Sequence, residues 1–134
     1  MYAIEDHGDI KVNLDLPKNV QVLADEVELA RVISNLLENA RRYGTGEVRV
    51  TVAREARHVL LRVCDRGPGV PASERERIFE PFYRMPGASE REGGVGLGLA
   101  LVRSIAQRHQ GSAHCEDNPG GGACFVLDLP SEQM

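Results

Sequence analysis

Hydrophobic and polar residues alternate along several short segments of the chain, which is the pattern of half-buried β-strands. The first segment, residues 9–16, reads Asp-Ile-Lys-Val-Asn-Leu-Asp-Leu, with every second position apolar. Residues 47–53 and 58–64 alternate in the same way and predict a β-hairpin whose charged turn is longer than the tightest kind. Residues 112–116 and 123–129 predict two closing strands around a glycine-rich turn. A short apolar run, residues 20–23, follows the first strand.

Apolar residues at helical spacing predict a long first helix. Asp25 followed by Glu28 resembles a capping box and places the helix start at Glu26. The helix is expected to continue to about Arg42, where Gly44 stops it. Its buried face is expected to contain Leu29, Ile33, Leu36, Leu37 and Ala40.

A second helix is expected over residues 97–109, with Gly111 ending it, and Ser73 could cap a short helix through Ile78. Residues 83–96 are rich in Gly, Arg, Glu and Ser without periodicity, which predicts a mobile loop. The expected fold is therefore a two-layer α/β sandwich. It has a mixed, mostly antiparallel sheet of about five strands packed on about three helices.

Composition limits the class of protein. A length of 134 residues predicts one domain, 1–134, whose hydrophobic core is large enough to be stable without disulfides or a structural metal. The net charge of −4 argues against a nucleic-acid module, which usually has a basic patch. No apolar run approaches a membrane span, and no signal peptide is expected before the fold. Cys64, Cys115 and Cys124 fit neither a disulfide framework nor a metal-ligand spacing, so buried free thiols in a reducing compartment are expected.

A polar strip borders the apolar face of the first helix. Asn35, Asn39, Arg42 and Tyr43 are neighbours at spacings of three and four residues. Carboxamide oxygens suit Mg²⁺, an arginine fork suits phosphate, and a tyrosine ring offers a surface for a base. Taken alone, the same strip is better explained as an ordinary solvated helix face, because asparagine is a common surface residue.

Two glycine-containing segments add further candidate chemistry. Asp65 closes a strand, where its carboxylate could accept a hydrogen bond from an exocyclic amine, and Gly67 and Gly69 would let the backbone pass close to a ring. Alone, this segment is a plain Asp/Gly turn. Residues 94–98 contain three glycines before an apolar helix, and so could present N–H groups to phosphates. This segment is neither a dinucleotide fingerprint nor a P-loop, because the required strand, acid and Lys-Ser/Thr pair are missing.

The order and spacing of these segments resemble the GHKL ATP-binding superfamily, and more narrowly the catalytic domain of bacterial sensor histidine kinases. Residues 35–43 are similar to the N box, 65–69 to the G1 box, 78–84 to the F box and 94–99 to the G2 box. Residues 120–122 before Ala-Cys-Phe are similar to the family's closing motif. The resemblance implies a Bergerat-type sandwich with an ATP lid at residues 83–96.

The resemblance also implies a role for each matched residue. Asn39 would ligate Mg²⁺ with support from Asn35, and Arg42 would meet the phosphates. Tyr43 would lie along the adenine, and Asp65 would accept its amine. The remaining implied contacts with ATP are Gly67, Gly69, Arg84, Gly94, Val95, Gly96, Leu97 and Gly98. Phe79 and Phe82 would either anchor the lid or fill core.

The implied activity is transfer of the ATP γ-phosphoryl group to a histidine in a two-component phosphorelay. His7, His58, His109 and His114 all lack the surroundings of the family's substrate histidine. The acceptor is therefore expected on a separate upstream dimerisation domain, and a response regulator downstream. The isolated domain is expected to be a monomer without autophosphorylation. The full-length protein would be a homodimer, with this domain on the cytoplasmic side of an inner-membrane sensor.

Two departures from the family pattern bear on this interpretation, and three other functions compete with it. Val95 stands where the family usually has a small hydroxyl residue, which removes one phosphate hydrogen bond worth about 1 kcal/mol. The second departure is the missing acceptor histidine.

GHKL ATPases that activate water carry a general-base glutamate at the position of Asn35, and an amide cannot take a proton, so a hydrolase is disfavoured. The chain could also be a docking module that is inactive alone, or an anti-sigma serine kinase.

Overall fold

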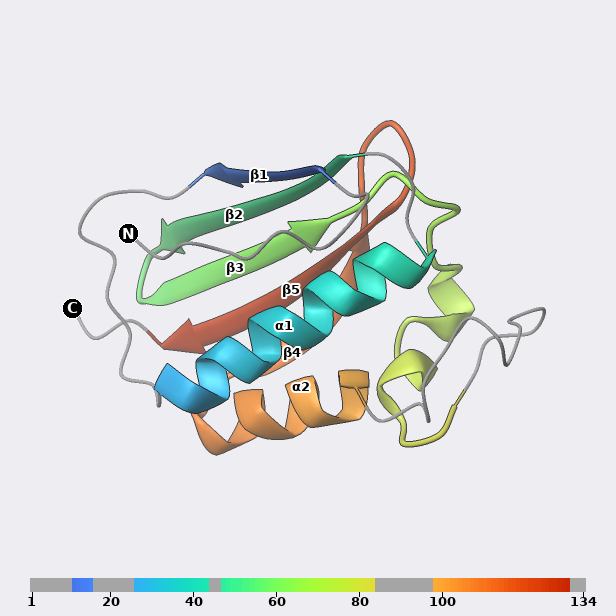
Figure 1. Ribbon diagram of the computed structural model, residues 1–134. Coiled ribbons are helices and arrows are strands. Elements are labelled where there is room, and N and C mark those ends of the chain that lie inside the picture. The colour runs from blue at the N-terminus through green and yellow to red at the C-terminus, as the bar shows by residue number, and fades with distance from the viewer. Residues whose placement is uncertain (1–10, 16–25, 44–46, 84–97, 131–134) are drawn as a thin grey trace.

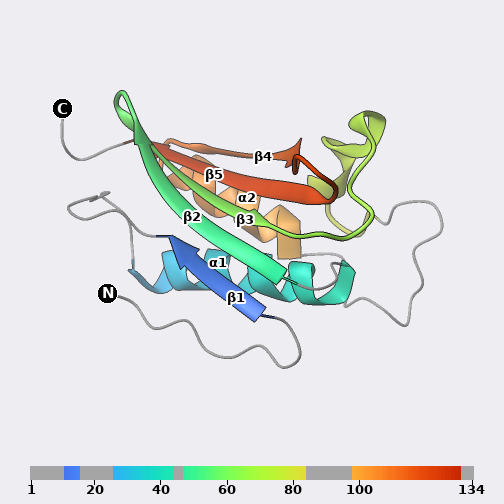
Figure 2. The ribbon, with the colours of Figure 1, turned by 90° about the horizontal axis from the view of Figure 1, so that it is seen from above.

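The computed structural model describes residues 11–15, 26–43, 47–83 and 98–130. A five-stranded sheet in the order β1-β2-β3-β5-β4 carries two α-helices on one face (Figures 1 and 2). The elements are β1 (Lys11–Asp15), α1 (Glu26–Tyr43), β2 (Glu47–Glu55), β3 (His58–Cys64), the 3₁₀ helices η1 (Ala72–Glu74) and η2 (Arg77–Phe79), α2 (Gly98–Arg108), β4 (Ser112–Asp117) and β5 (Ala123–Pro130). β1 pairs with β2 in parallel, and the other pairs are antiparallel. The predicted two-layer fold with a mixed, mostly antiparallel sheet is confirmed.

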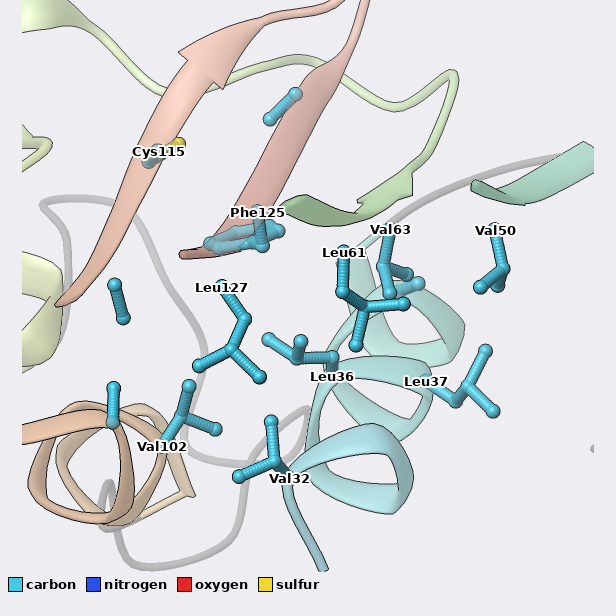
Figure 3. Close-up of a cluster of buried hydrophobic side chains, with 14 of the residues drawn as sticks. Val32, Leu36, Leu37, Val50, Leu61, Val63, Val102, Cys115, Phe125 and Leu127 are labelled. Carbon is cyan, nitrogen blue, oxygen red and sulfur yellow. The ribbon is translucent and has the colours of Figure 1, made fainter. Parts of the chain in front are cut away.

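The core lies between the helices and the inner face of the sheet. In Figure 3, Val32 and Leu36 of α1 and Val102 of α2 lie toward side chains of β3 and β5, whereas Leu37 of α1 lies toward Val50 of β2. Burying one such aliphatic side chain contributes roughly 1.5–3 kcal/mol. Leu36, Leu37 and Ala40 are buried as predicted, and Leu29 and Ile33 pack at the edge of the core. The fully buried Val32 was missing from the predicted face.

The hairpin between β2 and β3 is tighter than predicted. Glu55 pairs with His58, so that only Ala56 and Arg57 form the turn. Ala56 has φ 55°, in the left-handed region that usually selects glycine or asparagine. β2 therefore extends two residues past its predicted end at residue 53, because the turn lacks the glycine or asparagine that normally indicates a tight hairpin turn.

The short helix predicted over residues 73–78 is replaced by two 3₁₀ turns. The bonds run between residues three apart, from Glu74 N–H to Pro71 O at 2.9 Å and from Glu80 N–H to Arg77 O at 2.9 Å. Glu80 is extended (ψ 141°), as expected for a residue that precedes a proline, so the second 3₁₀ helix ends there. The run over residues 20–23 and the loop over 84–96 lie outside the described residues.

The C-terminal end of α2 has a different basis from the one predicted. Gln110 takes the left-handed conformation (φ 63°), and the N–H of Gly111 donates to Ala106 O at 2.8 Å. This is the closing bond of a Schellman motif. Gly111 is required for another reason: a Cβ on it would lie 2.0 Å from Asp128 O of β5. The helix therefore ends before the glycine, which lets the chain pass close to the sheet.

Two of the cysteines that were predicted to be buried free thiols are joined instead. Cys64 of β3 and Cys124 of β5 form a disulfide, whereas Cys115 is free and buried. The prediction was wrong because the two residues are partners in the sheet register, a relation between strands that neither strand shows alone. None of the described helices is long and apolar enough to cross a membrane.

Candidate functional site

Asp65 directly follows β3 and is the one buried polar or charged residue of the described part of the chain, with 5% of its surface exposed. Its Oδ1 accepts the N–H of Gly67 at 2.9 Å and the N–H of Ala123 at 3.3 Å. Both bonds end on the same oxygen, and no described donor bonds Oδ2. A buried carboxylate held in this way presents its second oxygen to an incoming donor.

The glycine-rich loop between β4 and β5 holds the backbone of Asp65 in place. The Asn118 side chain donates to Asp65 O at 2.7 Å, and the Asp65 N–H donates to Ala123 O at 2.9 Å. Gly122 has φ 103°, and a Cβ there would lie 2.0 Å from Asp65 O. Only glycine permits this approach. This role of Asn118 was not predicted, because an asparagine before Pro119 and three glycines has the sequence of an ordinary turn residue.

Arg66 joins the same loop to the turn that follows β3. Its guanidinium donates to Pro119 O at 2.7 Å and to Gly121 O at 3.3 Å. Gly69 in that turn has φ 81°, and a Cβ on it would stand 3.2 Å from Gly122 O. Gly69 was predicted to let the backbone pass close to a base ring. In the structure its close neighbour is the Gly122 backbone, and its contact with a base stays a prediction.

The polar strip of α1 meets the start of α2. Asn35 and Asn39 are half-buried and lie one helical turn apart. The Oδ1 of Asn35 would lie 3.9 Å from a Cβ on Gly98, the first residue of α2. The first N–H groups of a helix have no intrahelical partner and carry partial positive charge. Asn35 therefore borders a helix end that suits an anion.

Figures 1 and 2 agree on where these parts gather. The C-terminal end of α1, the N-terminal end of α2 and the segment that follows Asp65 lie at the same end of the sandwich. Two residues predicted to contact ATP, Arg42 and Tyr43, lie in the last turn of α1. The structure describes the backbone of both residues but not their side chains. Arg84, Gly94, Val95, Gly96 and Leu97 lie wholly outside the described residues.

The segment that leads to the predicted lid is anchored by two aromatic residues. Phe79 is buried in the core, with the Arg103 guanidinium 4.2 Å from its ring centroid. The Tyr83 hydroxyl donates to the Glu74 carboxylate, and this hydrogen bond raises the pKa of Tyr83. Phe82, with φ 65°, is 67% exposed and fills no core. Of the predicted pair, only Phe79 is a core residue.

A pocket of about 550 Å³ lies between the turn after β3 and the glycine-rich loop. Arg75 and Asp117 both line it and form an ion pair, with the guanidinium and carboxylate 2.6 Å apart. Gly69 is the only predicted site residue in its lining, and Asp65, Asn35 and Asn39 are not part of it. The pocket therefore adjoins the candidate site without defining it.

Fold and site together define a two-layer α/β domain with a polar site at one end, built from a buried carboxylate, glycine turns and a carboxamide strip at a helix start. The chain belongs to the histidine kinase-, DNA gyrase B- and HSP90-like ATPase family, whose model matches residues 24–133. The predicted resemblance to this superfamily is confirmed.

Its relatives include sensor histidine kinases. The sensor-like histidine kinase SenX3 of Mycobacterium tuberculosis is 39% identical over 129 residues, which cover 94% of this chain and 32% of that protein. The adaptive-response sensory kinase SasA of Rippkaea orientalis is 41% identical over 120 residues, 87% of this chain and 30% of that protein. The chain therefore spans about a third of the length of these curated relatives.

Solved structures give the same result. The mycobacterial sensor histidine kinase MprB superposes with a TM-score of 0.79 and 32% identity, covering 94% of this chain and 85% of that one. Full-length ShkA, solved in complex with AMPPNP, has a TM-score of 0.78 and 30% identity, covering 92% of this chain and 26% of that one. The fold is that of histidine kinase catalytic domains.

Proposed function

We propose that this chain is the catalytic domain of a sensor histidine kinase. In this proposal it binds Mg·ATP and transfers the γ-phosphoryl group to a histidine on a separate dimerisation domain. The observation that carries the proposal is Asp65, a buried carboxylate whose Oδ1 is saturated by two backbone N–H groups and whose Oδ2 has no described donor. An adenine amine supplies such a donor. Family membership and the AMPPNP complex of ShkA support the same ligand class.

The phosphates would lie toward the start of α2. Gly98 begins that helix beside the Asn35 carboxamide, and the unpaired N–H groups of a helix start favour anions. Arg42 would supply a cation from the end of α1, and Tyr43 a surface for the base. Arg84 and residues 94–96 would close over the triphosphate as parts of the lid, residues 83–96, and Leu97 would contact ATP beside them.

The residues present suit Mg²⁺ only when a nucleotide brings its own ligands. No group of three His, Cys, Asp or Glu side chains that could hold a metal occurs among the residues that the structure describes. Asn39 and Asn35 offer neutral carboxamide oxygens, and Mg²⁺ commonly combines one or two protein ligands with phosphate oxygens and water. Bound Mg²⁺ would neutralise charge on the phosphates.

Transfer is favoured over hydrolysis by the residue one turn before Asn39. Position 35 is an asparagine, which can orient a phosphate or water but cannot accept a proton. The phosphoacceptor histidine, its dimerisation domain and a downstream response regulator would then be partners of this domain. We propose that it is a single domain on the cytoplasmic side of a homodimeric membrane sensor.

The proposal is tested by titrating the chain with a fluorescent ATP analogue, with and without Mg²⁺. Binding that unlabelled ATP displaces and that Mg²⁺ strengthens is expected. Asn39→Ala should lose the Mg²⁺-dependent part while retaining its melting temperature, and Ser34→Ala, on an exposed part of α1, is the matched control. Absence of displaceable binding would contradict the nucleotide site. Unchanged Mg²⁺ dependence in Asn39→Ala would contradict the metal assignment alone.

A further inference from the structure

The disulfide between Cys64 and Cys124 lies next to Asp65. Inward side chains on these strands include Val63 and Phe125, which belong to the core. Because side chains alternate between faces, Cys64 and Cys124 lie on the opposite face of the sheet, away from the helices. Cys64 directly precedes Asp65, and Cys124 directly follows Ala123, whose N–H donates to the Asp65 carboxylate. The disulfide is therefore one residue away from the carboxylate on both strands.

The sheet register brings the two cysteines together without the bond. They are direct partners, and the hydrogen bond from Asp65 N–H to Ala123 O at 2.9 Å flanks them. This pattern makes them a non-hydrogen-bonded pair, the arrangement in which opposite side chains are closest. Their Cα atoms are 4.0 Å apart. Pairing of β3 with β5 continues to His58 and Pro130, so the ladder holds the strands together in either oxidation state.

We propose that Cys64 and Cys124 form a reversible redox pair whose oxidation state sets the affinity of the adjoining site for nucleotide. This coupling rests on the proposed nucleotide-binding function. The oxidant is a small-molecule disulfide. The Cys64 thiolate attacks it, forms a mixed disulfide and releases one thiolate. The Cys124 thiolate then displaces the second thiol, so that two protein thiols and one small disulfide give one protein disulfide and two small thiols.

Exposure of the three cysteines fits this assignment. Cys64 is half-buried and can meet a reagent, whereas Cys124 is only 5% exposed and acts as the resolving partner. Cys115 lies on the inner face, and burial raises its pKa to about 12, which keeps it an inert thiol. Disulfides inside cells, where we place this domain, are usually transient and redox-sensing.

Reduction is expected to act through the hydrogen bonds of Asp65. Two unbonded sulfur atoms cannot remain at bonding distance, so the strand ends must separate or the side chains rotate. The adjoining bond from Ala123 N–H to Asp65 Oδ1, at 3.3 Å, is the longer of the two that hold the carboxylate. When this hydrogen bond is weakened, the carboxylate can rotate, and Oδ2 is no longer held toward the incoming donor. The oxidised protein therefore binds adenine nucleotide more tightly than the reduced protein.

The experiment equilibrates the chain in glutathione buffers of different thiol-to-disulfide ratio and makes two measurements at each ratio. Alkylation followed by mass spectrometry gives the oxidised fraction, and titration with a fluorescent ATP analogue gives the Kd. We expect the Kd to fall by about fivefold as the pair oxidises, the lower end of typical coupling between sites. Cys115→Ser should behave like the unchanged chain, and Cys64→Ser should give one Kd at all ratios.

The unchanged chain alone can decide the question, so a variant that fails to fold does not weaken the test. A pair that stays reduced at every ratio, or a Kd that is equal in fully oxidised and fully reduced protein, would overturn the coupling. Absence of nucleotide binding in both states would overturn the coupling and the proposed function together, and the alkylation pattern would still report the redox chemistry separately.

Discussion

Replacing Asp65 by asparagine tests the proposed adenine contact with a minimal change in shape. The asparagine Oδ1 can still accept the N–H groups of Gly67 and Ala123, which places its NH₂ group where the carboxylate Oδ2 stood. An acceptor for the adenine amine thus becomes a donor that faces another donor. A hydrogen bond to a charged group contributes about 1.5–3 kcal/mol, and 1.4 kcal/mol corresponds to a tenfold change in affinity. We therefore expect ATP binding to weaken by about 10- to 100-fold.

The assay is competition of ATP and GTP against a fluorescent ATP analogue. Guanine carries a carbonyl where adenine carries its amine, so Asp65→Asn should lose affinity for ATP while its affinity for GTP stays equal or rises. Thermal unfolding serves as the control for folding, because the charge of the buried carboxylate also strengthens its two backbone hydrogen bonds. Unchanged ATP affinity in a variant that melts cooperatively would refute the adenine contact. A parallel loss of ATP and GTP binding would mean that Asp65 acts on the fold of the site and not on the base.

Three further predictions concern packing and titration. Gly122→Ala should lower the melting temperature more than Gly121→Ala. Both glycines have positive φ, but only a Cβ at position 122 would collide with Asp65 O, at 2.0 Å. Equal losses of melting temperature would show that backbone strain alone matters. Leu36→Ala in the core should reduce the free energy of unfolding by about 2–5 kcal/mol in urea titrations, and a loss below about 1 kcal/mol would contradict its burial. Burial raises the pKa of Cys115 from 9.0 to about 12, so its contribution to stability is complete below pH 9 and is lost as the pH rises toward 12. Cys115→Ala should show a shallower loss of stability across that alkaline range than the unchanged chain, and identical slopes would contradict the burial effect.

The layers of the fold could be predicted because they depend on local periodicity. The alternation of apolar and polar residues predicted all five strands, and apolar residues at helical spacing predicted that Leu36, Leu37 and Ala40 lie in the core. The hairpin turn could not be predicted, since Ala56 adopts a positive φ without being glycine or asparagine. There the pairing of the two flanking strands dictates the conformation of the residue.

The parts of the site that were missed depend on contacts between distant segments. Asn118 is 53 residues from Asp65 along the chain, and its hydrogen bond exists because β3 and β5 are neighbours. The disulfide between Cys64 and Cys124 has the same origin. Asp65 could be predicted as a candidate site residue because a carboxylate before a glycine turn is a local signal. A register between strands has no local signal, so it could not have been predicted from either segment.

Transfer of the labelled γ-phosphoryl group from ATP to a histidine-bearing dimerisation domain supplied in trans tests the central claim most directly. With Mg²⁺ present, the account predicts that label appears on the partner domain, in a linkage that acid breaks and alkali preserves. Asn39→Ala and Asp65→Asn should each reduce the rate, and label should be absent from the chain itself. Release of free phosphate without labelling of the partner would contradict the account and identify the domain as a hydrolase.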